Sequence, residues 1–318
     1  MSELLTIGEP LVVLCSTDPD STIQDSVNFN KVIGGAELNV AVGTRRLNHS
    51  VDYIGQVGDD PQGDFIRNEL NKRKINTDYL MTSKEFYTGY QMKQLVSQGD
   101  PFVFNFRKGS AASHIDQNII EKIDYSDTKI IHLTGIFPAS SSDALGTSIL
   151  LAQKANKSNI TLTFDPNLRP ALWTDKETMV KTINKIASYA DIVLPGQNEG
   201  KILTGYDDPE KIADFYLQGR AKAVFVKTGA KGSYVKTKDG HSAMISGFKV
   251  KEVVDTVGAG DGYALGVITA LLENKSYDQA AKRGNAIGSL QVRTHGDNDG
   301  YPMRNELDNY YLENGVEE

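Results

Sequence analysis

The chain of 318 residues contains a single cysteine, Cys15, so no disulfide can form within it. It offers no C-x-x-C pair for zinc binding or redox chemistry. Such low cysteine usage fits a reducing compartment, and we expect a cytoplasmic protein. The first residues, MSELLTIGEPLVVLCS, include no basic leader, which argues against a secretory signal peptide.

Long apolar runs, histidine clusters and an excess of basic residues are also missing. No run approaches the ~20 apolar residues of a membrane-spanning helix. The five histidines are scattered, so no transition-metal site is indicated. The net charge of −7 disfavours nucleic acids, whose phosphates need a basic surface. A small anionic substrate stays open, because a few arginines inside one cleft can reverse the local field.

Two common nucleotide-binding motifs are absent. No G-x-x-x-x-G-K-[ST] loop occurs, and the glycine-rich run at 258–262 has Tyr263 where G-x-G-x-x-G needs glycine. These absences disfavour a P-loop nucleotidase and a Rossmann dehydrogenase. A phosphate-binding loop in this chain must belong to another class.

Short β-rich runs alternate with helical patterns, which predicts an α/β fold with a mostly parallel sheet covered by helices on both faces. Strands are expected at 52–58, 129–136, 160–167, 191–196, 223–229 and 249–256. Helices are expected at 61–74, 141–158, 175–190, 207–220, 261–274 and 278–293. Ligands of such sheets bind beyond the carboxyl ends of the strands.

Two stretches, 11–33 and 86–108, have alternating side chains but no crossover helix after them. A turn is expected at Gln98–Pro101. We interpret both stretches as a small β-layer beside the main sheet, forming a lid. The whole chain, 1–318, is then one domain with this lid.

The run Gly258-Ala259-Gly260-Asp261 lies where a helix is expected to begin. Its glycines let backbone N–H groups converge on an anion, and the helix dipole adds positive charge there. Asp261 is also explained as a simple N-cap. Nearer the N-terminus, Gly34 and Gly35 open a helix with Asn39 one turn in, which suits either a polyhydroxy ligand or a helix cap.

Taken together, GGAELNVAV (34–42) and DTVGAGD (255–261) resemble the two signatures of the ribokinase-like (PfkB) sugar kinases. The resemblance extends over nearly the whole chain and includes 55–70, 164–173 and 226–235. It implies a three-layer sandwich with a mostly parallel central sheet and a small β-sheet lid.

The resemblance implies that Asp261 is the catalytic base, with Gly258, Ala259 and Gly260 forming the anion hole. Beside a helix N-terminus, this carboxylate is expected to be a weak base. A weak base suffices for a loose phosphoryl-transfer transition state, in which the proton moves late.

The resemblance also implies ATP as the phosphoryl donor, with Mg²⁺. The nucleotide-binding residues are then Gly196, Lys227, Thr228, Gly229, Lys231, Gly232, Gly258, Ala259, Gly260 and Asn285. Lys231 is otherwise a solvated loop lysine, and Asn285 a helix-surface asparagine. Glu199 supports the metal through water, although Gly196 stands where the family has asparagine. A monovalent cation near Asp255 and Thr256 is left open.

Among these kinases, GGAELNVAV is most similar to the 2-keto-3-deoxygluconate kinases. Matching that group implies a substrate site of Gly34, Gly35, Asn39, Tyr90, Asn105, Phe106, Arg107, Arg169, Asp261 and Asp297. Arg107 and Arg169 can converge on the carboxylate of an acid sugar. Arg169 is also explained as an architectural residue, and tyrosines frequent in the family are replaced by Asn105 and Phe106.

We therefore expect a kinase that phosphorylates 2-keto-3-deoxygluconate at its terminal hydroxyl. A fructokinase or another neutral-hexose kinase is the first alternative, followed by a kinase of nucleosides or other alcohols. A sugar-binding regulator without kinase activity is disfavoured by the intact Gly258–Asp261 run. The β lid predicts a homodimer or higher homo-oligomer, because an exposed β-layer is readily buried by pairing.

Overall fold

The computed structural model describes residues 2–97 and 101–316, so most of the expected turn at Gln98–Pro101 lies outside the described residues. The described chain contains a nine-stranded sheet of order β13-β12-β11-β10-β9-β8-β1-β4-β5. Its strands are β1 (Leu4–Ile7), β4 (Val51–Gly58), β5 (Leu80–Ser83), β8 (Ile130–Thr134), β9 (Thr161–Asp165), β10 (Ile192–Val193), β11 (Ala223–Lys227), β12 (Gly232–Thr237) and β13 (Ser242–Ser246). All neighbours from β11 to β5 are parallel, and β12 and β13 add an antiparallel edge.

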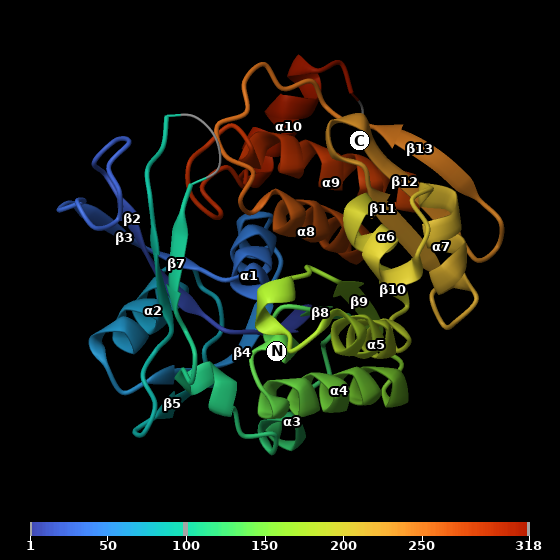
Figure 1. Cartoon of the computed structure of the whole chain (residues 1–318). Coiled ribbons are helices and arrows are strands. Elements are labelled where there is room, and N and C mark those ends of the chain that lie inside the picture. The colour runs from blue at the N-terminus through green and yellow to red at the C-terminus, as the bar shows by residue number, and fades with distance from the viewer. Residues whose placement is uncertain (1, 98–100, 317–318) are drawn as a thin grey trace.

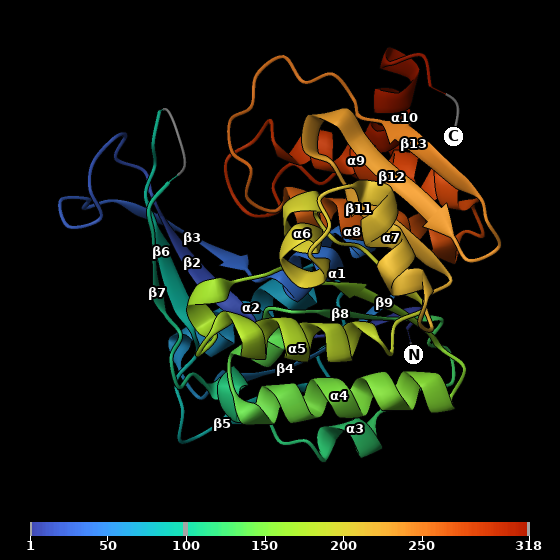
Figure 2. The same cartoon turned by 45° about the vertical axis from the view of Figure 1, so that its right-hand side comes forward.

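Helices cover both faces of this sheet and give a three-layer sandwich (Figure 2). One face holds α1 (Ala36–Arg46), α2 (Pro61–Lys72), α8 (Ala259–Leu272), α9 (Tyr277–Gln291) and α10 (Arg304–Glu313). The other holds α3 (Ile119–Lys122), α4 (Ser142–Lys157), α5 (Lys176–Ala187), α6 (Gln197–Thr204) and α7 (Pro209–Leu217). Each face has its own apolar core against the sheet. The predicted α/β sandwich is confirmed.

Local sequence explains where many helices begin. Side chains that accept N–H groups at helix starts are Asp60, Ser141, Asp175, Asp208 and Ser276. α8 is apolar around almost its whole circumference, and it lies buried between α1 and α9. Its first turn is more open, because Gly258 and Ala259 are half-buried and Gly260 is exposed, so a ligand can reach the helix N-terminus.

A second sheet forms the predicted lid (Figure 1). Its order is β3-β2-β6-β7, with β2 (Leu11–Ser16), β3 (Phe29–Gly34), β6 (Tyr90–Lys93) and β7 (Val103–Phe106). Each predicted segment supplies one antiparallel pair, and β2 joins β6 in parallel. The lid is therefore one sheet built from two separate parts of the chain.

The predicted strand at 249–256 is wrong. This stretch runs irregularly from β13 to α8, and Val253 is 58% exposed. Its alternation of valines and charged residues resembles a strand, but the antiparallel edge is already formed by β12 and β13, two strands that the sequence analysis missed. The Gly258 loop is consequently reached from an irregular segment and not from a strand end.

Candidate active site

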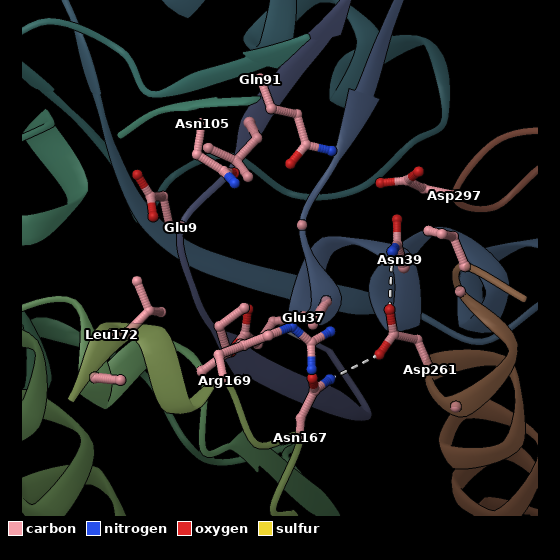
Figure 3. Close-up of a pocket in the computed structure, with 18 of the residues that line it drawn as sticks. Glu9, Glu37, Asn39, Gln91, Asn105, Asn167, Arg169, Leu172, Asp261 and Asp297 are labelled. Carbon is pink, nitrogen blue, oxygen red and sulfur yellow. Dashed lines mark hydrogen bonds between the residues drawn. The ribbon is translucent and has the colours of Figure 1, made fainter. Parts of the chain in front are cut away.

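A cavity of about 1000 Å³ lies between the lid and the carboxyl ends of the central strands (Figure 3). Lid residues Leu11, Gln91, Val103, Asn105 and Arg107 line one side. The loops after β9 and before α8 line the other. The position agrees with the edge at which parallel sheets bind ligands.

Asp261, in the first turn of α8, is held by two asparagines. Its Oδ2 accepts a hydrogen bond from Asn39 Nδ2 at 2.9 Å, and its Oδ1 accepts one from Asn167 Nδ2 at 3.1 Å (Figure 3). Asn298 in turn donates to Asn39 Oδ1 at 2.9 Å, which fixes the orientation of that amide. Asn39 therefore orients the predicted base. Asn167 and Asn298, which the sequence analysis did not single out, complete the arrangement.

Burial raises the pKa of Asp261 from 3.8 to about 7. The hydrogen bond from Asn39 and the charge of Arg169 oppose this rise, whereas the charges of Asp165 and Glu37 add to it. The expectation of a weak base is therefore corrected, because burial raises the pKa of this carboxyl well above its ordinary value. A carboxylate with a pKa near neutrality is suited to accept a proton at physiological pH.

Gly258 caps α8 in the left-handed conformation, with φ of 78°. A Cβ at this position would collide with the carbonyl oxygen of Asp297. Tyr301 Oη donates to Gly258 O at 2.7 Å and fixes the turn. Gly258, Gly260 and Asp261 line the cavity. The first N–H groups of α8 have no acceptor within the helix and are therefore candidates for the predicted anion hole. Ala259 belongs to this turn without lining the cavity.

A buried ion pair lies under the lid. Arg107 Nε donates to Glu9 Oε2 at 2.7 Å, and Ser110 Oγ donates to Glu9 Oε1 at 2.6 Å. The Glu9 side chain is 2% exposed and that of Arg107 is 14% exposed. Arg107 is thus fixed in the cavity wall by an internal carboxylate that the sequence analysis did not identify.

Glu37 lies next to this pair and accepts a hydrogen bond from Thr134. Burial raises the pKa of Glu37 to about 7, and the charge of Glu9 adds to the rise, while the Thr134 hydrogen bond and Arg107 oppose it. The cavity therefore contains two carboxyl groups, Glu37 and Asp261, that titrate near neutrality.

Arg169 extends across the cavity toward Asn167 and Asp261 (Figure 3). Its Nη1 donates to the carbonyl of Leu168 at 2.8 Å, which bends the side chain back over its own loop. At the end of β9, just before that loop, Asp165 forms an ion pair with Lys227 Nζ at 2.6 Å. Burial alone would lower the pKa of Lys227, but the charges of Asp165 and Glu199 outweigh it, so the pKa is raised and the lysine stays charged.

Asp297 lines the cavity close to Gly34, where a Cβ would lie 2.7 Å from Asp297 Oδ2. Its Oδ1 is buried without a hydrogen-bond partner among the described residues. The ammonium group of Lys93 lies 3.6 Å from this oxygen, which is beyond hydrogen-bond distance, so the oxygen can still accept a hydrogen bond from a ligand. Gly35, with φ of 117°, allows the chain to turn into α1 beside Glu9.

The register of the lid sheet separates the predicted substrate residues. Gln91 pairs with Asn105, and these two line the cavity. Tyr90 pairs with Phe106 on the opposite face, where their rings stack with centroids 4.6 Å apart. Tyr90 and Phe106 thus do not line the cavity in this structure, whereas Gln91, which the sequence analysis did not name, does.

The residues predicted for the nucleotide form a connected series beyond Lys227. Gly196 bridges to Lys227, Thr228 N–H and Oγ1 bind Gly232 O, and Gly232 pairs with Ser246. Asn285 Nδ2 donates to the carbonyls of Ile245 and Ser246. Gly229 and Lys231 are exposed at the turn before β12. Of the residues predicted to bind the nucleotide, all of which the structure describes, Lys227, Gly258 and Gly260 line the cavity.

Glu199 lies at the same end of the cavity and is a candidate for the metal. Its Oε1 accepts the Leu168 N–H at 2.8 Å, and its Oε2 accepts the Gly196 N–H at 2.7 Å. A side chain at position 196 would crowd this carboxylate, which explains the fit of glycine there. Because both oxygens are already engaged, Glu199 suits a magnesium ion held through water better than direct coordination. The described residues contain no cluster of three or more metal-binding side chains.

No helix in the described ranges is both long and apolar enough to span a membrane.

The chain is similar to known sugar kinases along its length. It is 40% identical over 306 residues to the 2-dehydro-3-deoxygluconokinase of Bacillus subtilis strain 168, covering 96% of this chain and 94% of that protein. The crystal structure of a PfkB protein from Polaromonas sp. JS666 matches with a TM-score of 0.88 at 37% identity, covering 97% of this chain and 99% of that one. A putative ribokinase II from E. coli in complex with ATP and Mg²⁺ has the same fold, with a TM-score of 0.87 at 23% identity and coverage of 98% and 100%.

The family model described as pfkB family carbohydrate kinase matches residues 1–304. This range contains both signatures, the lid, the cavity and Asp261. The resemblance predicted from the sequence is confirmed: the chain belongs to the pfkB family of carbohydrate kinases.

Proposed function

We propose that this protein transfers the γ-phosphoryl group of ATP to the terminal hydroxyl of 2-keto-3-deoxygluconate, giving 2-keto-3-deoxy-6-phosphogluconate. The observation that supports it best is that Arg107 and Arg169 line the same cavity as the buried Asp261. A guanidinium can bind the substrate carboxylate while a distant hydroxyl of the same molecule reaches the base. The 40% identity to a 2-dehydro-3-deoxygluconokinase supports the same substrate.

In this proposal Asp261 accepts the proton of the terminal hydroxyl as its oxygen bonds to the γ-phosphorus. The bond between that phosphorus and the β–γ bridging oxygen breaks, and ADP leaves. The N–H groups at the start of α8 stabilise the charge on the transferring group. Lys227, whose Nζ lies 3.8 Å from where a Cβ of Gly260 would be, adds positive charge on the same side.

We propose that the sugar acid is held by Arg107, Arg169, Asn105 and Gln91, with Gly34 and Gly35 allowing close approach. Asp297 Oδ1, which accepts no hydrogen bond among the described residues and lies 3.6 Å from Lys93 Nζ, is a ready acceptor for a substrate hydroxyl. Tyr90 and Phe106 then act through the lid, by supporting β6 and β7 from the outer face. The nucleotide is proposed to lie along Gly196, Thr228–Gly232 and Asn285.

We propose ATP and Mg²⁺ as the cofactors. Magnesium neutralises phosphate charge when bound, and Glu199 would support it through water. Beside Asp255, where the resemblance left a monovalent cation open, the ammonium group of Lys93 is already present. A kinase that consumes ATP fits the cytoplasm, as the sequence predicted.

We propose a homodimer formed through the outer face of the lid. Phe104 and Phe106 are 48% and 37% exposed on that face, and their ring centroids lie 4.9 Å apart, so pairing of two lids would bury adjoining apolar surface.

A panel of substrates tests the proposed reaction. Purified protein is assayed with Mg-ATP and equal concentrations of 2-keto-3-deoxygluconate, its galactonate epimer, fructose and a nucleoside. We expect the highest kcat/KM with an acid sugar. Faster phosphorylation of fructose would show that the neutral-hexose alternative is correct, and absence of turnover with every sugar would favour a sugar-binding regulator.

A further inference from the structure

A lysine of the lid reaches the Gly258 loop. Lys93, the last residue of β6, has a side chain only 6% exposed. Its Nζ lies 2.6 Å from Asp255 Oδ2 and 3.6 Å from Asp297 Oδ1. These two carboxylates are themselves 4% and 7% exposed. One buried ammonium group therefore lies between two buried acids.

Both acids support the loop that forms the anion hole. Asp255 Oδ1 accepts the Val257 N–H at 3.0 Å, and the Asp297 carbonyl packs against Gly258. Gln291 Nε2 donates to Val257 O at 3.0 Å and to Gly296 O at 2.7 Å, which ties the two segments together. Burial and the charge of Asp255 raise the pKa of Asp297, and Lys93 opposes that rise. Without a cation between them, the two buried acids would either repel each other or take up a proton, and both outcomes would disturb the loop.

Lys93 is well suited to be that cation. Burial alone would lower the pKa of Lys93, but the charges of Asp297 and Asp255 outweigh it and raise the pKa. Both oxygens of Asp255 are engaged, Oδ2 by Lys93 and Oδ1 by Val257 N–H. A free monovalent ion could bind Asp255 only after displacing the lysine.

We infer that Lys93 is the built-in monovalent cation of this site, a positioning residue that keeps the Asp255–Gly258 turn in place and links the lid to it. The protein accordingly requires no free potassium or ammonium ion. Deleting the lysine side chain leaves a buried, negatively charged space, which a small monovalent cation can enter. This inference is tested by two measurements. The measurement of kcat rests on the proposed kinase function, whereas the melting temperature does not.

The first experiment compares the wild-type protein in potassium and in tetramethylammonium chloride at equal ionic strength. We expect kcat and melting temperature to be the same in both salts, within about twofold for kcat. A wild-type protein that loses activity or stability in tetramethylammonium would overturn the inference, whatever the variants do.

The second experiment uses Lys93→Ala. In tetramethylammonium we expect kcat to fall on the order of 100-fold and the melting temperature to drop, because the acids are left unpaired. Potassium or ammonium ions should restore at least about tenfold of kcat and part of the melting temperature. A folded variant with normal activity, or one that no small cation restores, would refute the role.

Lys31→Ala is the matched control. Lys31 belongs to β3 of the same lid, and its Nζ lies 4.4 Å from the centre of the Phe65 ring, so its loss should show no dependence on the cation. One outcome is that Lys93→Ala does not fold in tetramethylammonium chloride. The inference is then supported if Lys93→Ala folds in potassium chloride and if the double variant Lys93→Ala/Asp255→Asn folds in both salts. A double variant that also fails to fold means that the lysine stem, and not its charge, is what matters. A wild type that phosphorylates no sugar would defeat the proposed function, while the melting temperatures would still test Lys93.

Discussion

Asn39 donates a hydrogen bond of 2.9 Å to Asp261, which lies 222 positions later in the sequence. The first signature motif therefore orients the carboxylate of the second. Each motif taken alone has an ordinary structural explanation as a helix start. The two side chains meet only because α1 packs against α8.

Replacement of the base is the first test. Asp261→Asn should lower kcat by about 10²–10⁴-fold while ATP binding persists, because the amide cannot accept the hydroxyl proton. In the wild type, Asp261 is active when ionised, so kcat/KM should be constant above a pKa of about 7 and fall about tenfold per unit below it. Glu37→Gln is the control, since Glu37 also has a pKa of about 7. If the acid limb of the kcat/KM profile vanishes in Glu37→Gln, that limb reports Glu37 and not Asp261.

The orientation of the base can be tested by adding charge. Asn39→Asp brings a second carboxylate against Asp261, and like charges favour the protonated form. The limb of the kcat/KM profile should therefore move to higher pH. Asn167→Ala removes the other donor without adding charge and should reduce kcat with a smaller displacement. Unchanged limbs in both variants would contradict the proposed arrangement.

The ion pair between Glu9 and Arg107 separates stability from substrate binding. Arg107→Met leaves a buried carboxylate unpaired, which should cost about 3–5 kcal/mol of the free energy of unfolding. Glu9→Gln in the same chain should recover most of that loss, measured by denaturant unfolding. The double variant should still discriminate poorly between an acid sugar and fructose. If the double variant regained its preference for the acid sugar together with its stability, Arg107 would not be the ligand of the substrate carboxylate.

Glu37 should make stability depend on pH. Its pKa is raised from 4.5 to about 7 on folding, so the folded state binds this proton more tightly. The associated stability is complete below 4.5 and is lost as the pH rises through about 7. Glu37→Gln should therefore gain melting temperature relative to wild type at about pH 8 and show less gain at about pH 5. An equal difference at both values would contradict the raised pKa.

The proposed dimer can be tested on the outer face of the lid. Phe104→Ser should shift the mass measured by light scattering from dimer toward monomer, because it removes apolar surface from the proposed interface. Leu312→Ser is the control, since Leu312 is 76% exposed in α10, away from the lid. A wild-type monomer at assay concentration would reject the dimer.

Much of the fold follows from local signals. The helices expected at 61–74 and 278–293 and the strand expected at 129–136 correspond to α2, α9 and β8. The stretch 249–256 misled because a strand needs a partner as well as alternation. Which side of the lid faces the cavity depends on a register of one residue, so Tyr90 could not be distinguished from Gln91.

The chemistry of the site was less accessible to sequence reasoning. The raised pKa of Asp261 is due to burial, which the motif does not reveal. Lys93 looks like any strand lysine until the fold brings it to Asp255. Motifs identify the residues that react, whereas the residues that tune them come from distant segments.

The parallel pairing of β2 with β6 also has a mechanical consequence. Four residue pairs, from Val12–Tyr90 to Cys15–Lys93, join the two hairpins by backbone hydrogen bonds. Neither hairpin can move away from the cavity alone without breaking the hydrogen bonds between β2 and β6. Entry of a sugar should therefore require the whole lid sheet to rotate about its connections to the main sheet. Substitutions that stiffen those connections should slow product release more than they slow phosphoryl transfer.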